Sequence, residues 1–227
     1  MRYAEKAQIK MQTFEETFIY EDVEVMTLTI KYPVIKVYKS PDAQVKINNQ
    51  IAIEVNEYFR YVSDILYEQA INDYKNAMEN DFPFHGYEAI MEYVITYNNN
   101  CFLSYYIDKY EFTGGAHGNT IRSSDTFELR SGTEIPLYCY FKEGTDYRRL
   151  LTNEMIKQAG SRLKDNPGIY FDDYKSLIIK NFDEDNYFLT PEGLAVYYQQ
   201  YDIAPYSTGI VVFTVPYKTI GWYPSCN

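Results

Sequence analysis

Hydrophobic and polar residues alternate in the first part of the chain, over about residues 6–38. The apolar positions of one face are Met26, Leu28, Ile30 and Tyr32, and the polar positions of the other are Thr27, Thr29 and Lys31. This period of two is typical of a β-strand with one buried face. Because proline has no N–H for a neighbouring strand, Pro33 predicts the end or the edge of this strand.

A helical spacing follows. Apolar residues recur every three or four positions up to about Met78, as on one face of an α-helix. The stripe consists of Ile47, Ile51, Val55, Tyr58, Val62 and Leu66. We expect Ser40 at the N-cap and Pro41 at the first helical position, since proline lacks the N–H that a first turn leaves unpaired. Residues 81–86 are expected to close the helix as a loop.

Further strands and helices are predicted in the rest of the chain. Alternation around residues 91–107 indicates a hairpin with its turn at Asn98–Asn100, because asparagine tolerates left-handed backbone. We expect Thr145 to cap a second helix and residues 173–180 to form a shorter one. A second hairpin is predicted from Tyr187–Leu189 and Leu194–Tyr198, and the run Ile210–Val215 is typical of a buried strand.

These elements predict an α+β fold in which helices pack on an antiparallel sheet. That sheet is expected to contain residues 88–112 and 210–215. The predicted core residues are Ile51, Val62, Leu66, Val94, Ile107 and Val212. We expect two modules, residues 1–110 and 111–227, that together form one compact unit.

The charge balance narrows the class of partner. The 227 residues include 21 Lys and Arg against 32 Asp and Glu, a net charge of −11. Such a surface repels nucleic acid and speeds the encounter with cationic partners. No apolar run approaches a membrane span, and residues 1–20 are too polar for a signal peptide. The protein is then either cytoplasmic, or extracytoplasmic with a leader or anchor missing from this sequence.

Cysteine and tyrosine each leave alternatives open. Cys101, Cys139 and Cys226 lack metal-type spacing, so one disulfide with a free thiol and three reduced thiols are both open. The 26 tyrosines suit half-buried strands, sugar stacking and protein interfaces alike. Four of them surround Pro205, namely Tyr197, Tyr198, Tyr201 and Tyr206. They form either a rigid projection for a cleft or a packed corner between strands.

The segment Phe112–Asn119 combines three glycines with His117. Histidine is suited to acid–base chemistry and metal binding, but a zinc site needs three or four donors and the other histidine, His85, is on a separate loop. Ser123, Ser124 and Asp125 show no nucleophile-elbow pattern and are expected to be turn residues. We therefore expect no metal, no cofactor and no enzyme. His117 is expected either to brace its loop or to contact a partner.

Two motifs carry a family resemblance. The Gly114–Gly118 loop and the tract Tyr201–Gly209 recur, in this order, in the extracytoplasmic domain of the RsiV-type lysozyme-sensing anti-sigma factors. That domain type is similar to the N-terminal part of the peptidoglycan deacetylase PdaC. The resemblance covers most of the chain. It implies an extracytoplasmic location, with a leader or anchor outside this sequence.

The resemblance also implies a function. It points to a non-catalytic binding or sensing domain of the cell envelope, with a cationic protein such as lysozyme as its partner. The expected contact residues are Gly114, Gly115, His117, Pro205 and Tyr206. The alternative is a peptidoglycan- or glycan-binding accessory module of a cell-wall enzyme, with tyrosines as stacking platforms. A hydrolase with an unrecognised site is a third hypothesis.

Overall fold

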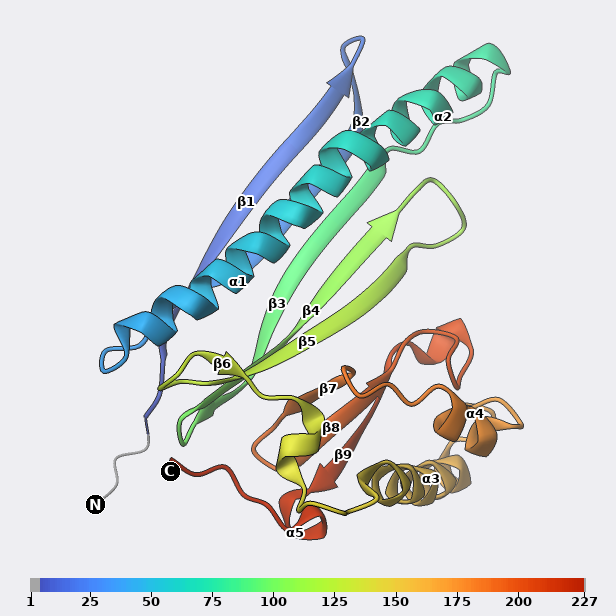
Figure 1. The fold of residues 1–227 in the computed structure, drawn as a ribbon. Coiled ribbons are helices and arrows are strands. Elements are labelled where there is room, and N and C mark those ends of the chain that lie inside the picture. The colour runs from blue at the N-terminus through green and yellow to red at the C-terminus, as the bar shows by residue number, and fades with distance from the viewer. Residues whose placement is uncertain (1–4, 227) are drawn as a thin grey trace. The chain divides into compact units, whose positions relative to one another are not determined.

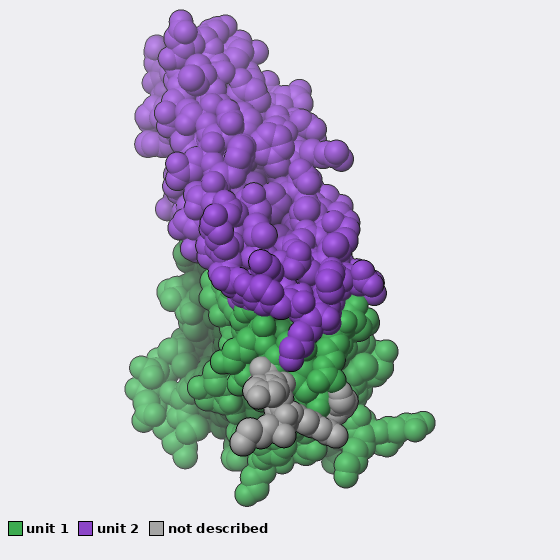
Figure 2. All heavy atoms as spheres, turned by 90° about the vertical axis from the view of Figure 1, so that its left-hand side faces the viewer, with its two compact units in different colours: residues 1–7, 94–106, 122–227 green, residues 8–93, 107–121 purple. Residues whose placement is uncertain are grey.

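A computed structural model describes residues 5–226 of the chain and contains two compact units (Figures 1 and 2). Of the described residues, 8–93 and 107–121 form unit 2, and 5–7, 94–106 and 122–226 form unit 1. The predicted boundary at residues 110 and 111 falls instead inside a strand. The division differs because three long strands run through both units, so the chain passes between them several times.

Unit 2 is a β-hairpin and a long helix on a sheet. Strands β1 (Gln8–Tyr20) and β2 (Val23–Lys36) pair antiparallel, and β2 then pairs parallel with β3 (Tyr87–Asn99), from Met26 opposite Tyr87 to Lys31 opposite Glu92. The predicted α+β class with an antiparallel sheet is thus confirmed for most of the sheet, and β2 with β3 is a parallel exception. A long helix connects the two strands, and such a crossover returns the chain in the same direction.

The long helix is the strongest feature that the sequence predicted. It comprises α1 (Pro41–Arg60), a π-helical segment (Tyr61–Leu66) and α2 (Tyr67–Glu79). Pro41 is the first helical residue and Ser40 the N-cap, as predicted, although the Ser40 side chain makes no capping hydrogen bond. Figure 1 shows the helix lying along β1, β2 and β3.

The main sheet has the order β1-β2-β3-β4-β5-β6. Strands β4 (Phe102–Phe112) and β5 (Asn119–Glu128) are long, whereas β6 (Thr133–Glu134) is short. The turn between β3 and β4 is Asn100–Cys101, with φ of 48° and 67°, rather than Asn98–Asn100. The Asn98 side chain accepts a hydrogen bond from the Ala7 N–H and donates one to the Ala7 carbonyl oxygen. Asn98 therefore stays in β3, and the turn lies later in the chain.

Unit 1 contains a separate antiparallel sheet of β7 (Tyr187–Leu189), β8 (Gly193–Tyr198) and β9 (Val211–Pro216). Helix α3 (Tyr147–Asp165) packs against β9 and against α4 (Tyr174–Lys180). Short helices occur at Leu137–Tyr140, at Tyr206–Thr208 and in α5 (Tyr217–Ile220). The expectation that residues 210–215 join the sheet of residues 88–112 is therefore wrong, because β9 pairs with β8.

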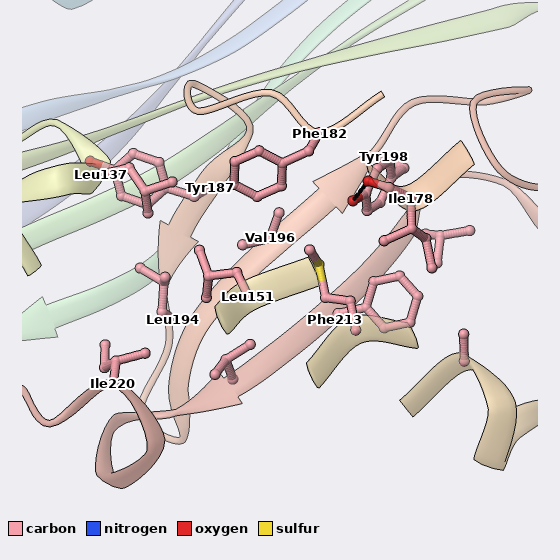
Figure 3. Close-up of a cluster of buried hydrophobic side chains, with 14 of the residues drawn as sticks. Leu137, Leu151, Ile178, Phe182, Tyr187, Leu194, Val196, Tyr198, Phe213 and Ile220 are labelled. Atoms are coloured by element: carbon pink, nitrogen blue, oxygen red, sulfur yellow. Dashed lines mark hydrogen bonds between the residues drawn. The ribbon is translucent and has the colours of Figure 1, made fainter. Parts of the chain in front are cut away.

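The core of unit 1 is rich in aromatic and branched side chains from this sheet and its helices (Figure 3). Within it, the Tyr198 hydroxyl donates a 2.7 Å hydrogen bond to the Ile178 carbonyl oxygen, so its polar tip is satisfied without water. The buried face of β9 carries Val211, Phe213 and Val215. Val212 points to the other face and is half-buried, which corrects its predicted place in the core.

Other sequence predictions are confirmed or corrected locally. Ile51, Val62, Leu66 and Ile107 are buried as predicted, whereas Val94 is half-buried because alternation gives the buried face to its neighbours. The cap of α3 is Asp146, whose carboxylate accepts from the Arg149 N–H, and not Thr145. Pro33 lies inside β2, beyond the last residue paired with β3, so its missing N–H removes no bond to that strand.

Cys101 and Cys226 form a disulfide, and Cys139 is an exposed free thiol. This settles the alternative that the sequence left open. Within residues 5–226, no helix combines the length and the apolar character needed to cross a bilayer.

Candidate functional site

The glycine loop connects β4 to β5 in unit 2, and two of its glycines are required by its geometry. Gly114 has φ +80°, where L side chains are strained. Gly118 is buried against Tyr110, and a Cβ at Gly118 would lie 2.3 Å from that ring. Gly115, in contrast, has no positive φ and open space around its Cα. The fold thus requires glycine at positions 114 and 118, whereas it has room for a side chain at Gly115.

His117 is exposed on this loop. Its Nδ1 lies 3.0 Å from the carbonyl oxygen of Gly118, within hydrogen-bonding distance. This contact fits the bracing role, since the ring is held against the backbone of its own turn. Within the described part of the chain, no group of three or more His, Cys, Asp or Glu residues is arranged to hold a metal ion.

Gly118, which is buried, and Gly115, which is exposed in the same loop, make a matched test of this assignment. Gly118→Ala is expected to lower the free energy of unfolding by about 1–3 kcal/mol, because the new methyl must displace the Tyr110 ring. Gly115→Ala is expected to change it by no more than about 0.5–1 kcal/mol and in the stabilising direction. Urea denaturation of both variants checks this. Equal losses would contradict the close packing at Gly118.

A hollow of about 260 Å³ lies beside Gly114, entirely within unit 2. Its walls come from the last turns of α2, the loop before β3 and the start of the glycine loop. They are formed by Asp73, Asn76, Ala77, Phe82, Pro83, Phe84, His85, Tyr87, Thr113 and Gly114. The hollow thus combines aromatic rings with a carboxylate, an amide and an imidazole.

Tyr87 and Asp73 form the polar part of this hollow. The buried Tyr87 hydroxyl donates a short hydrogen bond to Asp73 Oδ2 and accepts one of 3.1 Å from Gln69 Nε2. Burial, and then the Asp73 carboxylate, raise the pKa of Tyr87 to about 12. The phenol therefore stays neutral at physiological pH, and Asp73 keeps a fixed, exposed carboxylate at the edge of the hollow.

The sequence placed His85 on a separate loop, but the structure brings that loop against the glycine loop. A Cβ on Gly114 would lie 3.4 Å from the His85 carbonyl oxygen and 3.9 Å from its Cβ. The hollow could not be predicted from the sequence because its walls come from segments that are distant in the chain. The one available signal was the aromatic-rich Phe82-Pro83-Phe84 stretch before His85.

The tyrosine tract after β8 lies in unit 1, and its four tyrosines have different environments. Tyr197 and Tyr198 are 1% and 0% exposed and belong to the core, whereas Tyr201 is 54% exposed and Tyr206 is half-buried. The rings of Tyr201 and Tyr206 pack with their centroids 5.9 Å apart. The packed corner is therefore confirmed, and the same tract carries a surface aromatic pair, whereas its use as a projection for a cleft stays a prediction.

Tyr201 is held in an unusual backbone conformation. Its φ is 68°, a region in which bulky residues are rare. The turn around it is fixed by a hydrogen bond from the Asp202 N–H to the Gln199 carbonyl oxygen (3.2 Å) and by one from the Gln199 N–H to Asp202 Oδ2 (2.8 Å). Next to it, Ile203 and Ala204 are buried and support Pro205. The exposed Tyr201 ring thus stands on a rigid base.

The expectation that Ser123, Ser124 and Asp125 are turn residues is wrong, because they lie in β5. Ser124 Oγ donates to the Tyr187 carbonyl oxygen and lies 3.2 Å from the Tyr197 hydroxyl, so this serine ties β5 to the smaller sheet. Burial, and then the Asp125 and Asp185 carboxylates, raise the pKa of the nearby Glu134. Ser124 therefore has a structural use at this position.

The predicted contact residues divide between the two units. Gly114, Gly115 and His117 are in the glycine loop of unit 2, and Pro205 and Tyr206 are in the tyrosine tract of unit 1. The acidic charge is also uneven. The segments of unit 2 carry 17 acidic and 8 basic residues, a net charge of −9 out of −11 for the chain.

Taken together, the elements define an α+β protein with helices on mostly antiparallel sheets. Residues 19–120 match the family model described as "Deacetylase PdaC", and residues 141–218 match "Protein of unknown function (DUF3298)". The chain thus contains a PdaC-like domain followed by a DUF3298 domain. The PdaC part of the resemblance is confirmed, and its RsiV part stays a prediction.

Two solved structures have the same fold. A DUF3298-family member from Bacteroides fragilis aligns over 96% of this chain and 93% of its own, with a TM-score of 0.67 and 20% identity. A DUF3298-family protein from Pseudomonas aeruginosa aligns over 94% and 92%, with a TM-score of 0.62 and 16% identity. At these identities the similarity establishes the fold alone. No curated protein matches the chain in sequence.

Proposed function

We propose that the protein is a non-catalytic, extracytoplasmic binding domain for a cationic protein, with the Tyr201–Tyr206 pair as its aromatic contact. The observation that carries this proposal is the backbone of Tyr201. A tyrosine that is held at φ 68° and is 54% exposed gains little from burial. Strain of this kind usually persists where the side chain has a function.

The charge of the chain supports the choice of a cationic partner. A net charge of −9 in unit 2 attracts basic proteins over a Debye length and so raises the association rate. Exposed tyrosines are also suited to lysine and arginine side chains, whose cations are attracted to aromatic faces. Long-range attraction therefore comes mainly from unit 2, and the aromatic contact from unit 1.

The Cys101–Cys226 disulfide supports an extracytoplasmic location. Disulfides persist in oxidising compartments and are rare in the reducing cytosol. The resemblance of the glycine loop and the tyrosine tract to RsiV-type domains agrees with this location. It also makes lysozyme the first cationic protein to test.

The test is calorimetry of the oxidised full chain with a c-type lysozyme, using Tyr201→Gly. Glycine accepts φ 68° without strain, so this variant is expected to fold at least as stably as the natural chain. Its affinity is expected to fall by about 5- to 30-fold, which corresponds to about 1–2 kcal/mol. Tyr206→Ala should show a similar loss, and added salt should slow association without abolishing binding.

Tyr138→Ala is the matched control, because Tyr138 is also an exposed tyrosine of unit 1 but lies outside the tract. It is expected to bind normally. Absence of measurable heat with folded protein would remove lysozyme as the partner. Equal losses for Tyr138→Ala and Tyr201→Gly would remove the tract as the contact. Binding of soluble peptidoglycan fragments in place of lysozyme would favour the glycan-binding alternative.

A further inference from the structure

We propose that the hollow beside Gly114 binds an arginine side chain of the partner protein. The inference rests on the proposed function for its cationic partner, but it concerns a different surface, in unit 2. The structure supplies three features there that a guanidinium group requires, namely a fixed negative charge, aromatic faces, and the absence of a competing cation.

The first feature is the carboxylate of Asp73. Asp73 is exposed and lines the hollow, and its Oδ2 accepts the Tyr87 hydrogen bond, so the side chain is oriented. The Tyr87 phenol that orients it is itself fixed by Gln69. A carboxylate oriented in advance favours a guanidinium, because little side-chain entropy is lost on binding.

The second feature is the aromatic wall. Phe82 is 62% exposed at the rim, and Phe84 is held edge-on against Tyr74 with their centroids 5.3 Å apart. A planar guanidinium stacks on such faces and is less strongly hydrated than an ammonium group. The combination of stacking faces and a carboxylate therefore favours arginine over lysine.

The third feature is the absence of a competing cation, together with a local field that favours positive charge. The hollow adjoins the last turn of α2, where the negative end of the helix dipole favours a cation. Among the described residues that line it, none is lysine or arginine. Lys75, the basic residue of α2, has its Nζ 4.9 Å from the ring centre of Tyr20. The carboxylate of Asp73 is therefore open to a cation from outside.

The test is an NMR titration of the full oxidised chain with Nα-acetyl-arginine amide. We expect saturable shifts of the Gly114, His85 and Tyr87 resonances, with a dissociation constant of about 1–10 mM for this single contact. Nα-acetyl-citrulline amide has nearly the same shape without the charge and is expected to leave these resonances unchanged.

Asp73→Asn is expected to lower the affinity for the arginine probe at least about fivefold. Glu79→Gln removes an equal charge from the same helix outside the hollow and should leave the affinity unchanged. Phe82→Ala is a second variant. Because Phe82 is exposed, the substitution should leave the fold intact, and it should also lower the affinity for the arginine probe.

Several results would overturn the inference. They are no saturable shift with the arginine probe, equal binding of citrulline, or equal losses in Asp73→Asn and Glu79→Gln. Saturable shifts with N-acetylglucosamine but not with arginine would assign the hollow to a glycan. The calorimetry above tests the proposed function separately. Suppose that Tyr201→Gly loses lysozyme binding and that the arginine probe causes no saturable shift at the hollow. The proposed function would then stand, and only the inference about the hollow would be removed.

Discussion

Replacing Cys226 with alanine is expected to lower the free energy of unfolding by about 4–5 kcal/mol. The disulfide joins residues 125 positions apart, and a cross-link over so long a loop removes much of the conformational entropy of the unfolded chain. Guanidinium denaturation of the oxidised protein, followed by the fluorescence of the single tryptophan, measures this loss.

The tryptophan is well placed to report it. Trp222 lies close to Cys226 in the chain, and its ring packs edge-on against Tyr140 and Phe102, with centroid distances of 4.7 Å and 5.4 Å. Loss of the disulfide releases the segment that holds this ring, so the emission should also shift toward that of exposed tryptophan.

Cys139→Ala is the control, because Cys139 is an exposed free thiol. It is expected to change the stability by less than about 0.5 kcal/mol. A reductant should destabilise the natural chain and Cys139→Ala equally and should leave Cys226→Ala unchanged. A loss below about 1 kcal/mol for Cys226→Ala would show that the disulfide contributes little to stability.

Alkaline pH is expected to unfold the protein cooperatively, between the ordinary tyrosine pKa of about 10 and a pH of about 12. Burial raises the pKa of a large group of tyrosines with nearly inaccessible side chains. The group consists of Tyr58, Tyr87, Tyr140, Tyr187, Tyr197, Tyr198 and Tyr217. Their neutral forms are favoured in the folded state, so the resulting stability is complete below pH 10 and is lost as the pH rises through the folded pKa values.

The size of the effect follows from the number of groups. Each of these buried phenols opposes ionisation in the folded state, and the whole stability of a typical domain is only about 5–15 kcal/mol. Unfolding should therefore precede the titration of these residues. Tyrosinate absorbance should rise in two phases, a gradual one for exposed tyrosines and a steep one that coincides with the loss of circular dichroism.

An exposed tyrosine supplies the control for this prediction. Tyr223→Phe, at a side chain that is 60% exposed, should reduce the gradual phase and leave the steep one in place. A single smooth titration near pH 10 with unchanged circular dichroism would contradict the proposed cause, since buried phenols would then ionise without unfolding.

The sequence by itself determined the type and approximate bounds of the regular elements. The apolar stripe from Ile47 to Leu66 and the alternation from Met26 to Tyr32 depend on spacing along the chain, and each reports which face of one element avoids water. The helix began at Pro41, and β7, β8 and β9 lie where the pattern predicted them. Local chemistry was therefore sufficient for the elements and for the α+β class.

Tertiary structure decided the pairings between elements. Spacing along one strand does not specify its neighbour, so the parallel pair of β2 with β3 and the separate sheet of β9 could not be read from either strand alone. The turn at Asn100–Cys101 depended in the same way on a distant partner, since Asn98 is held by Ala7. The disulfide also required two residues distant in sequence to meet.

The same distinction applies to the candidate sites. The sequence indicated the glycine loop and the tyrosine tract, because unusual residues stand close together there. It did not separate Tyr201, on the surface, from Tyr198, in the core, since both are tyrosines in one short tract. It also did not indicate that Asp73 and Gly114 line the same hollow. Exposure and cavities depend on packing between segments distant in the sequence, and only the folded chain specifies that packing.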